Sequence, residues 1–311
     1  MLISNPHKNT LIVLVGPTGV GKTDLSIKLA QTLGCAIVSA DSRQFFRELK
    51  IGTAAPDETQ LTTVKHYFIG HKSITENYNA GQYEVDVLAL LERLFAENPV
   101  QMLVGGSMMY VDAVCRGLDE IPAVGEEIRQ KTAEIYAQDG IEGLQQELLQ
   151  LDPTYYEKVD LSNYRRVAHA VEISLTTGKP YSDLLTHKAK PRPFNIIKIG
   201  LNMSRSKLYE RINYRVDLMM EEGLLQEAEQ FYPYKDFNSL KTVGYRELFD
   251  FWDGKYTTLD EAVAMIKQDS RRYAKRQLTW FNADKTIHWF EPTQFGEIFA
   301  LLHGILSAKQ Q

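Results

Sequence analysis

The fold is decided by residues 11–23, Leu-Ile-Val-Leu-Val-Gly-Pro-Thr-Gly-Val-Gly-Lys-Thr. The first five are apolar and mostly branched, which is typical of a central strand covered on both faces. Residues 16–23 match the pattern GxxxxGK[ST], whose glycines let backbone N–H groups point at a polyphosphate. Helical periodicity follows from Thr23 to about Leu33, and Gly34 is placed to end that helix. A strand, a phosphate-binding loop and a helix in this order predict a P-loop protein, without indicating which diphosphate or triphosphate it binds.

The N-terminal third alternates strands and helices, as in a parallel α/β sheet. Two further apolar runs, residues 36–40 and 100–104, are predicted strands, and a helix of about residues 83–97 precedes the second. Because ligands of parallel sheets bind beyond the carboxyl ends of the strands, the segments after the three strands should form one crevice. These segments are residues 16–23, 41–44 and 105–107.

The composition shifts after about residue 118, and helical patterns alone continue to about residue 190. We therefore expect an α/β, P-loop NTPase-like core, a parallel sheet flanked by helices, made of residues 1–118 and 194–311. Residues 119–193 would form an all-helical insertion. The elements expected beyond residue 118 are helices at 126–137, 141–149, 164–177, 204–232 and 259–281 and strands at 194–200 and 286–290.

Composition excludes several classes of protein. The hydrophobic content of 44% and charged content of 24% are those of a globular protein, not a disordered one. The two cysteines, Cys35 and Cys115, form neither a disulfide framework nor a CxxC zinc pair. The net charge of −5 argues against a globally basic nucleic-acid binder, so such contacts would come from local patches. We see no signal peptide, no membrane span and no exposed apolar seam, and we expect a cytoplasmic monomer.

A single carboxylate, Asp41, stands where a predicted strand ends beside the phosphate loop. In a nucleotide hydrolase such a residue holds water on Mg²⁺, and in a transferase it can accept a proton. A simple turn aspartate is a third interpretation. Lys22 supplies a full positive charge to the loop, and the Thr23 hydroxyl can hold Mg²⁺ or a phosphate oxygen.

Five further strings follow one another along the chain: Asp41-Ser-Arg-Gln44, Ile51-Gly-Thr-Ala54, Leu103-Val-Gly-Gly-Ser-Met-Met-Tyr110, Leu208-Tyr-Glu-Arg-Ile-Asn-Tyr-Arg-Val-Asp217 and Arg271-Arg-Tyr-Ala-Lys-Arg-Gln-Leu-Thr-Trp-Phe281. In this order, from about residue 11 to residue 290, they resemble the motifs of the tRNA dimethylallyltransferase (tRNA isopentenyltransferase) family. With no Cys/His zinc finger near its C-terminus, the chain resembles the bacterial form of that family.

The resemblance implies transfer of a dimethylallyl group from dimethylallyl diphosphate to the exocyclic N6 amine of the adenosine 3′ to the anticodon of a tRNA. Asp41 would be the general base, and Lys22, Thr23 with Mg²⁺, and Arg215 would stabilise the departing diphosphate. Diphosphate binding is expected from Gly16, Pro17, Thr18, Gly19, Val20, Gly21, Lys22 and Thr23.

The adenosine would have to leave the anticodon stack to reach Asp41, so we expect recognition of an extruded base in the anticodon stem-loop. On a helix, four cations of the last string fall within about 140° of one face, which suits phosphates. The resemblance extends the expected tRNA contacts to Asp41, Ser42, Arg43, Gln44, Ser107, Arg129, Arg165, Arg166, Lys241, Tyr245, Arg246, Arg271, Arg272, Lys275 and Arg276.

Four positions depart from the family pattern: Ser107, Ala55, Gly125 and His169. They leave open a paralogue with altered tRNA choice. The sequence also admits an isopentenyltransferase acting on free adenine nucleotides, a small-molecule P-loop kinase and a non-catalytic tRNA-binding paralogue. The helical insertion and the cationic string argue against the free-nucleotide enzyme and the kinase. The retained Lys22, Asp41 and Arg215 argue against a non-catalytic protein.

Overall fold

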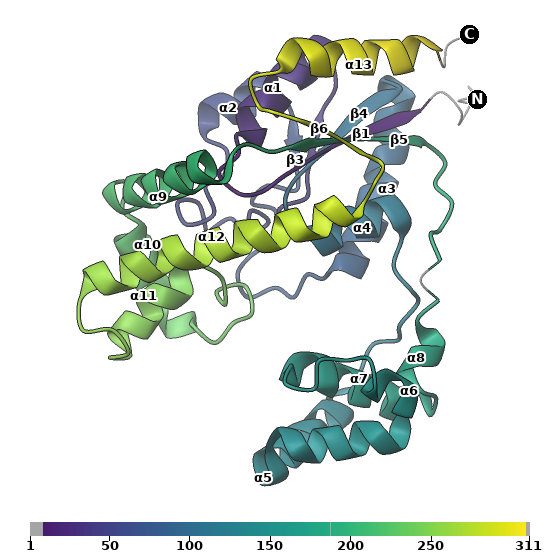
Figure 1. Ribbon diagram of the computed structural model, residues 1–311, viewed down its shortest axis with the longest axis vertical. Helices are drawn as coiled ribbons and strands as arrows, with labels where there is room; N and C mark the ends of the chain where they lie inside the picture. The colour runs from purple at the N-terminus through teal and green to yellow at the C-terminus, as the bar shows by residue number, and fades with distance from the viewer. Residues whose placement is uncertain (1–8, 187, 309–311) are drawn as a thin grey trace. The chain divides into compact units, whose positions relative to one another are not determined.

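A sheet of six parallel strands forms the core of the computed structural model, which describes residues 9–186 and 188–308 (Figure 1). The strand order is β3-β2-β4-β1-β5-β6. All six residues of β1, TLIVLV, are buried, as expected of a strand covered on both faces. The strands are β1 (Thr10–Val15), β2 (Ile37–Ser39), β3 (His66–Tyr67), β4 (Val100–Val104), β5 (Asn195–Leu201) and β6 (Ile287–Phe290).

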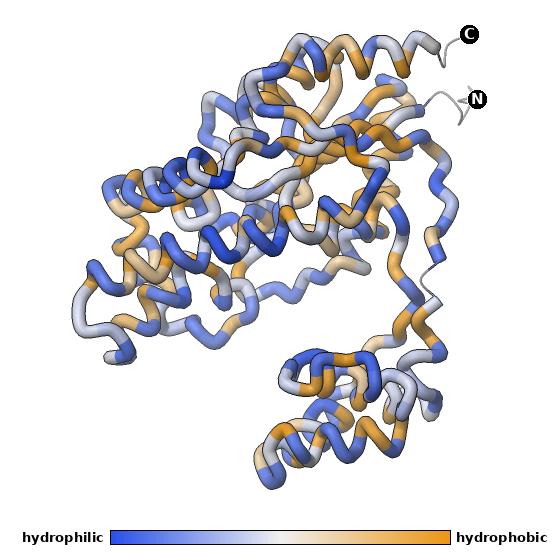
Figure 2. The backbone as a smooth tube through the Cα atoms, in the orientation of Figure 1, coloured by the Kyte–Doolittle hydropathy of each residue, from blue (hydrophilic) through white to orange (hydrophobic). Residues whose placement is uncertain are grey.

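Helices cover the sheet on both faces, because successive side chains of a strand point to opposite sides. Leu11 and Val13 pack with residues of α3 (Ala80–Glu97) and α4 (Met108–Arg116). Ile12 and Leu14 pack instead with α1 (Lys22–Leu33), α9 (Arg205–Glu221) and α13 (Phe295–Ala308). Figure 2 shows the hydrophobic residues gathered on the central strands. The predicted fold class, a P-loop-like parallel sheet flanked by helices, is confirmed.

The register of the sheet brings three loops together at the carboxyl ends of the strands. Leu14 of β1 is paired with Val104 of β4, and Val104 is paired with Ser39 of β2. The chain then continues through Gly105, whose N–H donates to the Leu14 carbonyl. A Cβ at Gly105 would lie 2.2 Å from the carbonyl oxygen of Ala40, so this close approach of two loops requires glycine.

A smaller group of helices packs beside the sheet, and here one prediction is wrong. The helix expected at 204–232 is two helices, α9 and α10 (Leu224–Phe231), separated at Gly223, which has a left-handed φ of 102°. The break lets α10 turn and pack against α11 (Tyr245–Trp252) and α12 (Leu259–Ala283) in a shared apolar cluster. The sequence pattern also failed to predict α2 (Glu58–Thr63), β3, α4, α6 (Pro153–Tyr156), α8 (Tyr181–Leu184), the short η1 (Tyr232–Tyr234), α11 and α13.

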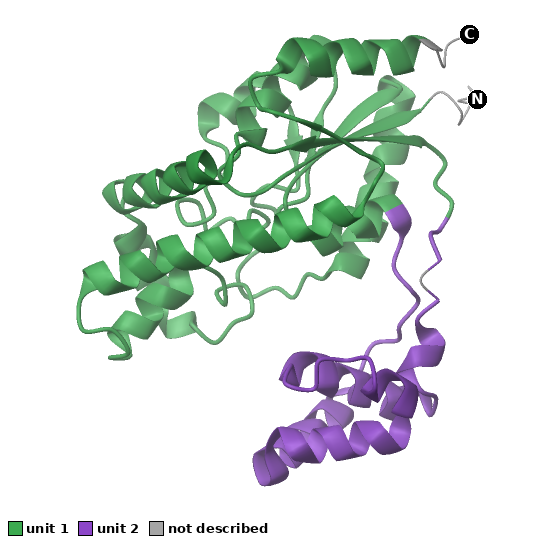
Figure 3. Ribbon diagram, viewed as in Figure 1, with its two compact units in different colours: residues 1–115, 191–311 green, residues 116–190 purple. Residues whose placement is uncertain are grey.

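Residues 116–190 form a second compact unit, and residues 1–115 and 191–311 make up the first (Figure 3). The second unit consists of α5 (Glu126–Leu151), α6 (Pro153–Tyr156), α7 (Tyr164–Thr177) and α8 (Tyr181–Leu184) around its own apolar cluster. Gly140, at φ 66° and ψ −155°, interrupts α5 between the two helices expected there. No helix in the described part of the chain is long and apolar enough to cross a membrane.

Candidate active site

The glycine-rich loop joins β1 to α1 and curls around a lysine. The Lys22 ammonium donates hydrogen bonds of 2.9 Å to the carbonyl oxygens of Gly16 and Pro17. Gly19 and Gly21 have φ of 79° and 104°, a left-handed backbone that favours glycine. The loop therefore has the shape that the GxxxxGK[ST] pattern predicts, with α1 starting at the lysine.

Two arginines of α9 hold the same loop from the side. The Arg211 guanidinium donates to the Gly19 carbonyl at 2.9 Å, and Arg215 donates to the Thr18 hydroxyl at 3.4 Å. They lie four residues apart, and hence on one face of the helix. The loop thus gathers three cations before any anion is bound.

Electrostatic interactions link two of these cations, Lys22 and Arg215, to Asp41. Burial lowers the pKa of Lys22 to about 8; the Asp41 carboxylate opposes this shift and the Arg215 guanidinium adds to it. Burial also lowers the pKa of Arg215, again against the effect of Asp41. A bound polyphosphate would relieve the repulsion between the cations, so this cluster favours an anionic ligand.

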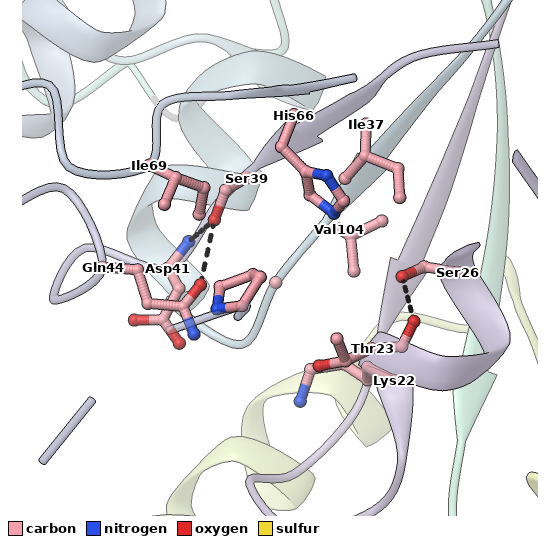
Figure 4. Close-up of a pocket in the computed structure, with 12 residues that line it drawn as sticks. Lys22, Thr23, Ser26, Ile37, Ser39, Asp41, Gln44, His66, Ile69 and Val104 are labelled. Carbon is pink, nitrogen blue, oxygen red and sulfur yellow. Dashed lines mark hydrogen bonds between the residues drawn. The ribbon is translucent and has the colours of Figure 1, made fainter. Parts of the chain in front are cut away.

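Asp41 follows β2 and lines a pocket of about 50 Å³ together with the start of α1 (Figure 4). Its Oδ1 accepts a hydrogen bond from the Arg43 N–H at 3.1 Å, and its own N–H donates to the Ser39 hydroxyl. The pocket is lined by Lys22, Thr23, Ser26, Ile37, Ser39, Asp41, Gln44, Pro56, His66, Ile69, Val104 and Gly105.

A much larger cleft, of about 1650 Å³, shares Asp41, Lys22 and Thr23 with this pocket. It extends between α9, α12 and the loop around residues 50–58. The Asp41 carboxylate is therefore open to this cleft, and its role as a base stays a prediction. Among residues 9–186 and 188–308, no three His, Cys, Asp or Glu side chains form a cluster that could hold a metal ion.

Ser107 supports the Asp41 segment from the end of β4. Its hydroxyl oxygen accepts a hydrogen bond from the Ser42 N–H at 2.9 Å and lies 3.1 Å from the Ser42 hydroxyl. Its own N–H donates to the Ala40 carbonyl. Tyr273 of α12 also interacts with Ser107, while burial raises the pKa of Tyr273 to about 12. Ser107 is buried, and its hydrogen bonds hold residues 40–42 in position.

Gln277 of α12 connects two of the three loops. Its amide oxygen accepts from the Thr18 N–H at 2.8 Å, and its amide nitrogen donates to the Gly106 carbonyl at 2.9 Å. The side chain is buried, so each bond would be costly to lose. Sequence reasoning missed this residue, although it lies within the Arg271–Phe281 string that carries part of the family resemblance.

A half-buried carboxylate organises the loop at residues 50–54. Glu227 of α10 accepts hydrogen bonds of 2.9–3.0 Å from three successive N–H groups, those of residues 50–52, and another from the Tyr245 hydroxyl. The loop in turn holds Gln44, whose amide donates to the carbonyls of Thr53 and Ala54. Glu227 therefore braces the strand-end segment that carries Asp41, and sequence reasoning gave no sign of it.

The profile of the IPP transferase family matches residues 44–284 of this chain. The chain belongs to the IPP transferase family.

Individual relatives of this IPP transferase agree. It is 54% identical to tRNA dimethylallyltransferase 1 of Phocaeicola vulgatus, over 96% of this chain and 99% of that protein. A solved tRNA isopentenylpyrophosphate transferase of Bacillus halodurans is 35% identical, with a TM-score of 0.72 over 97% of this chain and 98% of the other. A solved eukaryotic dimethylallyltransferase acting on tRNA has 25% identity and a TM-score of 0.78, over 93% of this chain and 75% of that one.

One residue expected to touch tRNA in this IPP transferase does not lie where RNA could reach it. Tyr245 is 0% exposed, its hydroxyl donates to Glu227, and its ring closes on Gly52, where a Cβ would lie 2.5 Å away. The prediction of an RNA contact at Tyr245 is therefore wrong. The side chain has a packing role instead.

The other cationic side chains expected to contact the RNA differ in how many hydrogen bonds and ion pairs they make within the protein. The Arg43 guanidinium donates to the Asn238 and Ser239 carbonyls, and Arg246 pairs with Glu247 and Asp269. Lys241, Arg246 and Arg276 line the large cleft. On α12, Arg271 donates to Asn213, Arg272 pairs with Asp269, and Lys275 is exposed.

In the second unit, Arg129 lies near the start of α5, and Arg165 and Arg166 lie in the first turn of α7. Arg165 and Arg166 are exposed, and the Arg129 guanidinium is 4.0 Å from Glu126. Their contact with tRNA stays a prediction.

Proposed function

We propose that this IPP transferase transfers a dimethylallyl group from dimethylallyl diphosphate to the N6 amine of the adenosine 3′-adjacent to the anticodon of tRNAs, releasing diphosphate. The observation that carries the proposal is one pocket lined by both the Asp41 carboxylate and the cationic phosphate loop. A base and an anion site side by side are what this displacement needs.

The diphosphate would lie on the backbone N–H groups of Gly19, Gly21, Lys22 and Thr23 at the start of α1, where the helix dipole favours negative charge. Lys22 and Arg215 would stabilise the negative charge that develops on the leaving oxygen. Ile37, Ile69 and Val104 give the small pocket an apolar wall suited to a five-carbon group. The ammonium, the guanidinium and the apolar wall would together orient the allylic carbon toward the cleft.

The acceptor amine would enter from the large cleft, so that its nitrogen lies beside Asp41. As the new carbon–nitrogen bond forms, the bond from the allylic carbon to the diphosphate oxygen breaks. The amine proton passes to the Asp41 carboxylate. Ser107, through Ser42, and Glu227, through the loop at 50–54, would keep that carboxylate in place.

The hydroxyl oxygen of Thr23 would help to hold a Mg²⁺ ion shared with the diphosphate. Thr23 lines the small pocket, and its hydroxyl makes no hydrogen bond within the described residues. Magnesium prefers such oxygen ligands and keeps several waters. When bound, the ion would neutralise part of the charge on the diphosphate oxygens.

A tRNA acceptor is favoured over a free adenine nucleotide, because the relatives given above are named for tRNA. We propose that the enzyme extrudes the target adenosine from an anticodon stem-loop and acts as a monomer in the cytoplasm, where its substrate is found.

The test is to incubate the protein with radiolabelled dimethylallyl diphosphate and Mg²⁺, offering unmodified tRNA, AMP or an ADP/ATP mixture. Label is expected in tRNA, and in none of the nucleotides. A transcript with guanosine at the target position is the matched control and should stay unlabelled. Label in AMP alone would overturn the tRNA acceptor, and no label in any acceptor would overturn the transfer itself.

A further inference from the structure

Tyr214 of α9 has an exposed ring without a partner. It is 64% exposed, lines the large cleft, and makes no hydrogen bond or ring contact within the described residues. Several other exposed aromatic side chains in the described residues have a partner within the protein. Two are ring contacts, Tyr136 with Tyr164 and Tyr234 with Phe237, and one is a hydrogen bond from Trp280 to Asp112. An aromatic face kept open inside a binding cleft calls for a ligand.

The position of this ring is well fixed, because α9 is anchored on either side of it. Residues 213 and 217 are bound to α12: Asn213 accepts a hydrogen bond from Arg271 at 2.5 Å, and Asp217 pairs with Lys267 at 2.5 Å. Figure 1 shows α9 and α12 as the two long helices that border this region. Arg211 and Arg215 lie three and one residues from Tyr214 and hold the phosphate loop. The ring is thus presented on the helix face that borders the substrates.

Tyr214 lines the large cleft but not the small pocket that contains Asp41 and Lys22. The cleft, at about 1650 Å³, is also larger than the 300–1,000 Å³ or so that encloses a drug-sized ligand, so it has room for more than one nucleotide. Under the proposed function the target adenine lies beside Asp41. The Tyr214 ring, which is outside that small pocket, is therefore available to a neighbouring base of the RNA.

Resting on the proposed function, we propose that Tyr214 is a stacking platform for an unpaired base that flanks the target adenosine. Its ring packs on the face of that base, while the nearby Arg211 and Arg215 keep the phosphate loop in place. Stacking of this kind needs the ring but not the hydroxyl, and it tolerates any base.

The experiment measures binding of a fluorescent anticodon stem-loop by anisotropy, and label transfer in parallel, for wild type, Tyr214→Ala, Tyr214→Phe and the control Tyr234→Ala. Tyr214→Ala should raise the Kd for RNA about 5- to 150-fold, the effect of losing one base–aromatic stack. Its KM for dimethylallyl diphosphate should stay unchanged. Tyr214→Phe and Tyr234→Ala should bind RNA as wild type does.

A stem-loop with an abasic nucleotide identifies the partner base. When the abasic nucleotide replaces the base that stacks on Tyr214, wild type should bind this stem-loop as weakly as Tyr214→Ala binds the intact one. Combining the abasic RNA with Tyr214→Ala should lower the affinity no further than either change alone. Unchanged RNA binding by an active Tyr214→Ala variant would overturn the platform while leaving the proposed function intact. So would equal losses in Tyr214→Ala and Tyr214→Phe. A wild-type protein that neither binds nor labels RNA would overturn both.

Discussion

At the scale of single residues, the site depends on a carboxylate and an ammonium that lie close enough to affect each other. Asp41 raises the pKa of Lys22, and burial lowers it by more. Asp41→Asn neutralises the carboxylate and keeps its shape, while Lys22→Arg keeps the positive charge but loses it only at a much higher pH, so the two contributions can be measured separately.

Asp41→Asn should lower the single-turnover rate of prenyl transfer by roughly 10²-fold or more, because the amide keeps the bond to the Arg43 N–H but accepts no proton. Rapid-quench measurement with saturating RNA checks this. Glu92→Gln, on the exposed face of α3, is the control and should keep the wild-type rate. An undiminished rate in Asp41→Asn would remove Asp41 as the base.

The affinity for dimethylallyl diphosphate should fall as the pH rises above about 8. The free enzyme loses the Lys22 proton near that pH because burial lowers its pKa to about 8, whereas the bound diphosphate favours the ammonium. Binding above pH 8 therefore takes up a proton, and the Kd rises with pH. Titrations between pH 6.5 and 9.5 measure this, and in Lys22→Arg the dependence should disappear. A flat profile in the wild type would contradict it.

At the scale of elements, the half-buried carboxylate of Glu227 in α10 fixes a loop that belongs to a distant part of the sequence. Glu227 gathers N–H groups from residues 50–52 and the hydroxyl of Tyr245 at the start of α11. Residues 50–52 and Tyr245, which lie far apart in the sequence, thus meet on one side chain.

Tyr245→Phe should lower the free energy of unfolding by about 1 kcal/mol, because the partly buried hydrogen bond to Glu227 is lost. Its affinity for tRNA should stay at the wild-type value, since the side chain is fully buried. Urea denaturation and RNA binding are to be compared on the same preparation. A clear loss of RNA affinity with unchanged stability would restore Tyr245 as an RNA contact.

Sequence patterns predicted those helices, strands and loops whose structure depends on residues close together in the chain. Residues 10–33 are a buried strand, a glycine loop and a helix, and each is indicated by its own residues. The break at Gly223 was not predicted, because the residues before and after it continue one helical pattern. The glycine itself was the signal that the helix ends there. Gln277, Glu227 and the burial of Tyr245 depend on partners far away in sequence, which no periodicity encodes.

At the scale of the whole molecule, a chain of net charge −5 has to bind a polyanion through local groups of cations. Arg272, Lys275 and Arg276 of α12 are all exposed and lie within one turn and a half of each other. Arg276 also borders the large cleft.

Arg272→Ala should weaken tRNA binding and reduce the slope of log affinity against log salt by about 0.7–0.9, the value for one phosphate contact. Turnover at saturating tRNA should be unchanged. The control is Lys255→Ala, an exposed cation paired with Asp250 and not among the predicted RNA contacts. Binding curves over a range of KCl concentrations provide the measurement, and equal slopes for all three proteins would refute the contact.

The two hydrogen bonds of the Gln277 side chain connect α12 to both of the proposed substrate sites. The helix carries the cations expected to meet the RNA backbone and, through the Gln277 amide, also holds the phosphate loop that we propose binds the prenyl donor. A displacement of α12 along its axis would therefore change the binding of both the donor and the acceptor. Selection for a new tRNA along this helix would then carry a cost in donor affinity, and the two preferences of the enzyme would evolve as one trait.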